Sequence, residues 1–450
     1  MRAARAQGAD RMSHDARKAL LELFTETRDR TESLSVRLSA EDQQLQSMPD
    51  ASPTKWHRAH TTWFFETFVL EPAGVDVVDA RYGALFNSYY EAKGPRHARP
   101  KRGLLSRPSA AEVGEYRRLV DARTKKLLAE ARTDDLERMR PVVELGIAHE
   151  EQHQELILTD ILHAFSESPL RPSFLGGADK TGRASGRPEP MRFVGFEGGL
   201  HAIGASGTES FAFDNEGPRH KEWVEPFELG DRLVTVGELK AFIREGGYDT
   251  ASLWLSEGFE LIRTQGIKAP LYATLEDGQL QTFTLAGPRI AADDEPATHL
   301  SYYEADAIAR FLGARLPTET EWEIAASNDP VGGTFLDDMT LRPAPVQATS
   351  ASAEPVERSA LHAPPSPRAR QLFGDAWEWT RSSYEPYAGY RAPPGALGEY
   401  NGKFMVNQRV LRGGSCLTPR RHIRASYRNF WPAPTRFQMT GLRLAREAPR

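Results

Sequence analysis

Apolar residues recur at helical spacing through the first third of the chain. They do so over residues 19–38, and again in TKWHRAHTTWFFETFVL, where Ser52 and Pro53 fit an N-cap and a first helical residue. Ser109 and Glu112 form a capping-box pattern before a third helix, and a fourth is predicted from Asp134 or Pro141 to residue 165. Four helices with one long loop predict a helix bundle, in which inward side chains can build a metal site.

The pattern changes after a segment rich in Ser, Gly and Pro at residues 166–190. Short apolar runs with glycine and aromatic residues then dominate, with helical spacing only at 236–245 and 301–312, which predicts an α+β domain. Residues 329–370 are rich in Pro, Ala and Ser and are predicted to form a surface loop. We therefore expect a helical domain over 13–165, a linker over 166–190 and a second domain over 191–447.

Composition narrows the function classes. A length of 450 residues favours two domains, and a net charge of -5 argues against a nucleic-acid binder. No apolar run approaches the length of a membrane span. The only cysteine, Cys416, excludes an intramolecular disulfide and fits a cytoplasmic location, which we expect. The opening MRAARAQGADRM lacks the apolar core of a secretory signal, and Met12 is an alternative start.

The stretch HEEQH, from His149 to His153, matches the H-E-x-x-H pattern of zinc metallopeptidases. Residues i and i+4 share a helix face, so the two histidines can bind one ion. The extended peptidase pattern fails, however, because Leu156 stands at its glycine position and Thr159 at its third histidine. Two ordinary core or surface histidines are the plain alternative, so the motif alone does not assign a function.

A third ligand is predicted on the second helix. His60 shares a stripe with Trp56, Trp63 and Phe64, the pattern of a buried face, whereas His57 is expected to be exposed. Three imidazoles around one ion would leave other coordination positions open, which suits both zinc and Fe(II) oxygen chemistry. The residues alone do not choose between these two metals.

Motifs from about residue 13 to 445 together resemble the ergothioneine-biosynthetic sulfoxide synthases. In the first domain they are SPTKWHRAHTTWFFETFVL, LFNSYYEAKGPRHARPKRGLLSRP and HEEQHQELIL; in the second they are GDAWEWT, VLRGGSC, YRNFW and TGLRLA. In that family a DinB-like four-helix bundle precedes a C-type-lectin-type domain like that of formylglycine-generating enzymes. The resemblance thus implies an α bundle followed by an α+β domain.

The resemblance also implies an Fe(II) site formed by His60, His149 and His153. The family uses O2 to join a thiol sulfur to C2 of the imidazole of hercynine (Nα-trimethylhistidine), giving a sulfoxide. Gln152 matches a glutamine that orients the hercynine imidazole. Hercynine, cysteine and O2 are the implied substrates.

Further site residues follow from the same resemblance. Arg99 and Arg102 match an arginine pair that holds the carboxylate of the thiol substrate, although a solvated basic loop is the plainer interpretation. Asn429 and Phe430 match residues that hold the carboxylate and trimethylammonium end of hercynine. Trp431 completes this predicted pocket but stands where one subgroup has aspartate, so that contact is not carried over.

A tyrosine pair is the last implied feature. Tyr90, slightly ahead of Tyr89, is predicted to supply the active-site phenol, and elsewhere in the family a tyrosine of the second domain does so. The tyrosine-pair subgroup uses free cysteine as its sulfur donor.

Several alternatives stay open at this point. The same chemistry could use γ-glutamylcysteine or a selenium donor, HEEQH could belong to a zinc metallopeptidase, and the second domain could be a lectin-like binding module. Formylglycine-generating activity is not expected, because it needs a cysteine pair and Cys416 is alone. The acidic run at 293–295 could hold calcium, although such runs are more often surface loops.

Overall fold

The computed structural model describes residues 2–176, 186, 188–207, 209, 211–346, 368–394 and 396–449. The chain divides into two compact units. A helical unit comprises Met1–Gly176 and Ala392–Gly402, and a sheet unit comprises Gly177–Arg391 and Lys403–Arg450. The short segment Ala392–Gly402 therefore belongs to the helical unit, although the chain on both of its sides belongs to the sheet unit.

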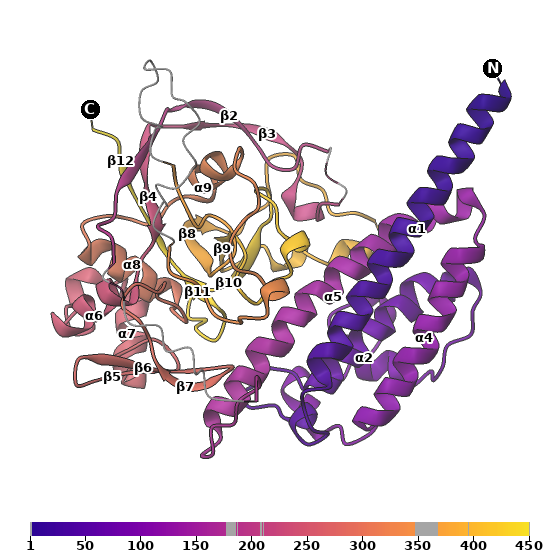
Figure 1. Ribbon diagram of the computed structural model, residues 1–450, viewed down its shortest axis with the longest axis horizontal. Coiled ribbons are helices and arrows are strands. Elements are labelled where there is room, and N and C mark those ends of the chain that lie inside the picture. The colour runs from indigo at the N-terminus through magenta and orange to yellow at the C-terminus, as the bar shows by residue number, and fades with distance from the viewer. Residues whose placement is uncertain are drawn as a thin grey trace, which may run out of the picture. The chain divides into compact units, whose positions relative to one another are not determined.

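Four long helices lie side by side in the helical unit (Figure 1). They are α1 (Arg2–Ser35), α2 (Thr54–Phe65), α4 (Ala110–Glu130) and α5 (Thr133–Glu167). A π-helical turn, Glu66–Leu70, continues α2, and the short α3 (Tyr82–Phe86) lies in the connection to α4. Helices α1 and α2 both pack against α4 and α5. The predicted four-helix bundle is confirmed.

The helix starts test the capping predictions. The capping box before α4 is confirmed: the Ser109 hydroxyl accepts from the backbone of Glu112, and the Glu112 carboxylate accepts from the backbone of Ser109. The start of α2 was predicted one residue too early, because Pro53 occupies the N-cap position. Ser52 instead makes tertiary contacts, its N–H donating to Asp160 at 2.8 Å and its hydroxyl accepting from Arg102 at 2.9 Å.

Helix α2 is the centre of the bundle. All of its twelve residues are buried, polar ones included. It comes very close to α5 at Gly146, where a Cβ would lie 2.8–2.9 Å from ring atoms of Phe64 and Phe65. A residue without a side chain is therefore required at this point, one turn before His149.

The sheet unit contains short strands and helices. Its strands are β1 (Phe193–Phe196), β2 (Gly199–Ile203), β3 (His220–Val224), β4 (Phe227–Leu233), β5 (Ala273–Glu276), β6 (Gln279–Thr284), β7 (Gly287–Ile290), β8 (Trp377–Ser383), β9 (Gln408–Arg412), β10 (Asn429–Pro432), β11 (Thr440–Gly441) and β12 (Arg443–Glu447). Its helices are α6 (Val236–Arg244), α7 (Ser256–Gln265), α8 (Tyr302–Phe311) and α9 (Glu319–Ala326). Helices α6 and α8 match the two predicted there, whereas α7 and α9 were not predicted.

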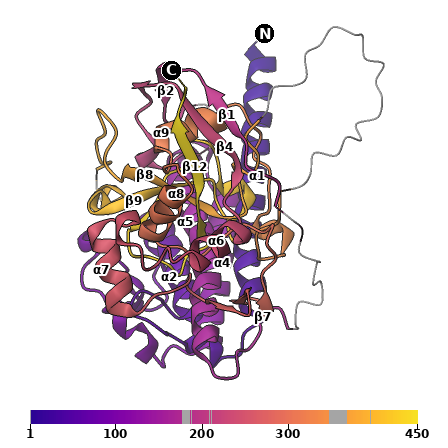
Figure 2. The same cartoon turned by 90° about the vertical axis from the view of Figure 1, so that its left-hand side faces the viewer.

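Four small sheets organise these strands. Their orders are β1-β4-β12, β10-β9-β8-β11, β2-β3 and β5-β6-β7, and β4 lies between β1 and β12 in Figure 2. Every named pairing is antiparallel except β11 with β8. The predicted α+β character is confirmed. Part of the predicted loop at 329–370 forms a 3-10 turn at Leu336–Asp338, and residues 347–367 lie outside the described part of the chain.

A buried ionic cluster ties α5 to its neighbours in the bundle. The Glu150 carboxylate is fully buried and accepts from Arg28 at 2.6 Å, from Thr31 at 2.6 Å and from Arg117. Arg28 and Thr31 are on α1 and Arg117 is on α4. Burial alone would raise the pKa of Glu150, but the two guanidinium groups lower it. The carboxylate is therefore ionised in the folded protein.

We expect Glu150→Gln to lower the free energy of unfolding by about 3–5 kcal/mol, because two buried cations lose their shared partner. Urea unfolding at neutral pH measures this loss, and Glu115→Gln is the control. Glu115 pairs with Arg118 on the surface, both side chains being 72% exposed, so its loss should change stability by less than about 0.5 kcal/mol.

The stability that the Glu150 carboxylate contributes depends on pH. Because the pKa of Glu150 is depressed in the folded protein, its contribution to the free energy of unfolding is fully present above the ordinary glutamate pKa of 4.5. That contribution is lost as the pH falls through the folded pKa. The gap in stability between the wild type and Glu150→Gln should therefore narrow in acid. A gap that is small at neutral pH would contradict this role.

Candidate metal centre

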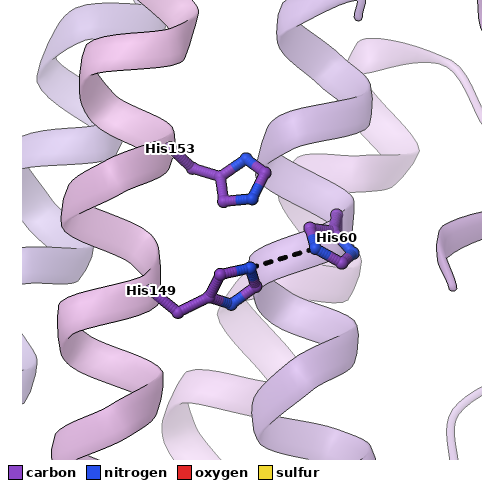
Figure 3. A group of neighbouring side chains, drawn as sticks. All are labelled: His60, His149 and His153. Atoms are coloured by element: carbon purple, nitrogen blue, oxygen red, sulfur yellow. Dashed lines mark hydrogen bonds between the residues drawn. The ribbon is translucent and has the colours of Figure 1, made fainter. Parts of the chain in front are cut away.

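Three histidines converge inside the helical unit. His149 and His153 lie one turn apart on α5 and point toward His60 on α2 (Figure 3). One ring nitrogen from each lies within 4.8 Å of the others, and His60 Nε2 and His149 Nε2 are 3.1 Å apart. All three side chains are buried. The structure thus brings together the three residues that the sequence proposed as metal ligands.

The ring of His60 is held on three sides. Its Nδ1 lies 2.6 Å from the carbonyl oxygen of Phe86, which can only accept, so Nδ1 carries the proton and Nε2 presents a lone pair. Trp56 stacks on the ring at 4.6 Å between centroids, and Trp63 stacks at 5.8 Å. The residues of the predicted stripe therefore fix the orientation of this imidazole.

His57 is also part of the centre, which corrects the prediction that it is exposed. Its side chain is only 2% exposed, with Nδ1 at 2.7 Å from His153 Nδ1 and Nε2 at 3.0 Å from the Asp160 carboxylate. The prediction was wrong because α2 has no exposed face, and a polar residue buried by polar partners leaves no mark in hydrophobic periodicity.

The protonation of the triad suits a cation. Burial lowers the pKa of His149 to about 3 and holds the pKa values of His60 and His153 well below the ordinary range. The imidazoles are therefore neutral at neutral pH, the form in which histidine binds metal. Since three nitrogen donors converge in a buried space, the residues present fit a transition-metal ion such as Fe(II) or Zn²⁺.

The glutamate of H-E-x-x-H does not face this centre. Glu150 is fully buried and bonded to Arg28, Thr31 and Arg117. A general base must reach a water held at the metal and must be able to take up a proton. With its lowered pKa and its two cations, Glu150 cannot fill that role, which argues against the metallopeptidase interpretation.

Tyrosine side chains gather beside the triad. Tyr90 is fully buried, its hydroxyl lies 3.4 Å from that of Tyr89, and burial raises its pKa far above that of a free phenol. Tyr90 contacts the ring of Phe64, which also contacts His149. The predicted pair therefore lies near the triad, with Tyr90 deeper than Tyr89.

A third phenol, Tyr400, was missed by the sequence analysis. Its ring lies 5.6 Å from that of His149 and 6.1 Å from that of Tyr89, and its hydroxyl donates to the side-chain oxygen of Gln152. It belongs to the Ala392–Gly402 segment. The neighbouring Glu399 holds this segment by accepting from the backbone of residues 91 and 92. No local pattern signals this contact, which spans 248 positions along the chain.

The two predicted arginines differ sharply. Arg102 is 2% exposed and stacks 3.4 Å over the Trp56 ring, whose stacking partner is His60, while Arg99 is exposed. Arg102 donates to the hydroxyls of Ser52 and Ser88, and among the described residues no carboxylate lies within ion-pair distance of it. Burial, and then Arg99, lower its pKa to about 9.

The predicted residues of YRNFW lie in the sheet unit. Asn429, Phe430 and Trp431 are half-buried on β10. Phe430 stacks on Tyr384 at 4.0 Å and on Phe404 at 6.0 Å. Trp431 meets Phe437 edge to face. Phe430 is thus part of an aromatic wall of the type that attracts quaternary ammonium groups.

Two minor expectations also have outcomes. The side chain of Cys416 is fully buried, which is consistent with a packing role. In the acidic run at 293–295, Asp293 pairs with Lys240 at 2.8 Å and Glu295 with Arg289 at 2.6 Å. Their charges are satisfied by cationic side chains, so the structure gives no support for calcium here.

Within the described residues, no helix combines the length and apolarity needed to cross a membrane.

Comparisons with known proteins agree with this architecture. Residues 23–157 match the DinB superfamily and residues 181–448 match the sulfatase-modifying factor enzyme 1-like domain. A hercynine oxygenase of Mycobacterium tuberculosis is 32% identical over 88% of this chain and 91% of its own length. A second, from Mycolicibacterium smegmatis, is 31% identical over 96% and 99%. A formylglycine-generating enzyme of Streptomyces coelicolor is 28% identical over 51% of this chain and 81% of its own. The chain, in which a DinB-type bundle precedes a sulfatase-modifying-factor-like domain, belongs to the family of the hercynine oxygenases.

Proposed function

We propose that this protein is an Fe(II)-dependent oxygenase that joins the sulfur of cysteine to C2 of the imidazole of hercynine and forms the sulfoxide. The observation that carries the proposal is the buried, neutral triad of His60, His149 and His153 beside a group of phenols. Three imidazoles leave coordination positions free for substrates. Ferrous iron, when bound, supplies the redox chemistry by which O2 can take electrons from the thiol and the imidazole.

The overall reaction balances without a further reductant. The thiol S–H and the imidazole C2–H bonds break, and the C–S and S–O bonds form. One oxygen atom of O2 goes to sulfur, and the other leaves as water with the two hydrogens. Forming the C–S bond gives up two electrons and oxidising sulfur gives up two more, which together reduce O2.

Arg102 is proposed to hold the carboxylate of the sulfur donor. A buried guanidinium bonded only to neutral hydroxyls gains strongly from a carboxylate, which its planar donors can hold with two parallel bonds. Exposed Arg99 would add a second cation at the rim. Gln152 is proposed to orient the imidazole of hercynine, with Tyr400 fixing its amide. Asn429, Phe430 and Trp431 are proposed to hold the amino-acid end of hercynine.

The phenols are proposed to control the outcome of the oxidation. A phenol that keeps its proton at neutral pH can deliver it as oxygen is reduced, and Tyr90 is held in that form by burial. Tyr89 and Tyr400 lie within the same aromatic group. Tyr90 is the proposed donor among the three.

The metal assignment is tested by removing His60. We expect His60→Ala to lose tight iron binding, because two imidazoles remain where three converge. Protein loaded anaerobically with Fe(II) and then passed through gel filtration gives the iron content. His163→Ala is the matched control: it removes a histidine from α5 that lies outside the triad. Equal iron in wild type and His60→Ala would contradict the assignment.

The reaction itself is tested with Fe(II)-loaded protein, hercynine and O2. Cysteine should give the coupled sulfoxide, identified by mass spectrometry, at a higher kcat/KM than γ-glutamylcysteine. Coupling with γ-glutamylcysteine alone would correct the donor and keep the chemistry. Casein hydrolysis by zinc-loaded protein, with no sulfoxide in any reaction, would reverse the proposal in favour of a peptidase.

The donor of the proton is tested with three single variants. We expect Tyr90→Phe to divert cysteine to its sulfinate. Coupling should slow by about 10²–10⁴-fold, the usual rate contribution of a positioned general acid. Tyr89→Phe should retain coupling. Tyr400→Phe should mainly raise the KM for hercynine, because it frees the Gln152 amide. The ratio of sulfinate to sulfoxide measures each case, and sulfinate from Tyr400→Phe but not from Tyr90→Phe would make Tyr400 the donor.

A further inference from the structure

His57 and Asp160 form a hydrogen-bonded chain that ends on one of the triad histidines. The Asp160 carboxylate oxygen Oδ2 lies 3.0 Å from His57 Nε2, and His57 Nδ1 lies 2.7 Å from His153 Nδ1. All three side chains are at most 8% exposed, so water competes little for these bonds. The residues come from two helices, His57 from α2 and the other two from α5.

The chemistry of these atoms fixes where each proton sits. The same Asp160 oxygen accepts the backbone N–H of Ser52 at 2.8 Å, which holds it in place as an acceptor. His57 Nε2 must then carry a proton, and a neutral His57 has a lone pair on Nδ1. Two nitrogens 2.7 Å apart share one proton, so His153 Nδ1 donates. His153 Nε2 is left with its lone pair, as metal binding requires.

We infer that His57, held by Asp160, is the positioning residue of the metal centre: it selects the tautomer and the ring orientation of His153. This inference rests on the proposed metal site. It assigns no contact between His57 and the ion; its effect passes through His153. Hydrogen bonds of this kind to a ligand histidine typically change metal affinity by about 10–100-fold.

The three ligands are supported differently, and this makes His57 specific to one of them. His60 Nδ1 donates to the Phe86 carbonyl, a backbone acceptor that no substitution removes. His149 Nδ1 is buried without a hydrogen-bond partner among the described residues. Among the three ligands, only His153 has its Nδ1 bonded to another side chain. Replacing that side chain can therefore change the orientation of His153 while leaving His153 itself in place as a ligand.

The experiment measures Co(II) affinity, by chelator competition under anaerobic conditions, and the visible d–d spectrum of the bound ion. We expect His57→Leu, which fills much of the space but cannot accept a hydrogen bond, to weaken Co(II) binding by about 10–100-fold and to alter the spectrum. His57→Asn should recover most of the affinity, because its side-chain oxygen can take the place of Nδ1 as acceptor. The melting temperature of the metal-free proteins separates these effects from lost stability.

Matched controls make the outcomes distinct. His163→Leu removes an imidazole from α5 itself, outside the triad, and should leave affinity and spectrum unchanged. Wild-type affinity and spectrum in His57→Leu would overturn the inference, and so would an Asn variant no better than Leu, which would leave His57 a packing role. If the wild type itself binds no Co(II), the proposed metal site fails and the inference fails with it.

Discussion

The buried carboxylate of Glu150 is the constraint on which the metal centre depends. Its bonds to α1 and α4 fix the rotation of α5 about its own axis. Successive residues of a helix are turned by about 100°, so a fixed Glu150 directs the preceding residue, His149, to a different side, toward α2. The pattern H-E-x-x-H is satisfied here by an acid that holds the helix and by two histidines that face another helix.

Close packing between α2 and α5 supplies the second condition. Gly146 lets the two helices approach until Phe64 and Phe65 would touch a Cβ, and the imidazoles of the next turn then meet across the gap. Because α2 is buried on every side, its polar residues need partners within the protein. Arg58 pairs with Glu32, Thr62 accepts from Arg28, and His57 bridges Asp160 and His153. The environment of the metal centre is therefore a polar network built through the core.

The sequence carried the features that rest on local periodicity and on motif resemblance. Helical spacing found the bundle and selected His60, since this residue lies among the aromatic side chains that stack on it. The same spacing misjudged His57, because periodicity reports apolar burial and is blind to a polar side chain buried by its partners. Ser52 was misassigned as a cap for a related reason, its donor and acceptor both being used by distant residues. Tyr400 had no local signal at all.

Arg102 shows how the same network could serve substrate binding. Taking a guanidinium out of water is costly unless an anion compensates it, and here the compensation within the described residues comes from two hydroxyls and the face of Trp56. A site of this kind favours a planar carboxylate over water, which a solvated basic loop would not. Ser52 joins the two functions in one residue: its hydroxyl holds Arg102 and its backbone holds Asp160. A shift of the α2 start would therefore disturb both the Arg102 guanidinium and the hydrogen-bonded chain that ends on His153.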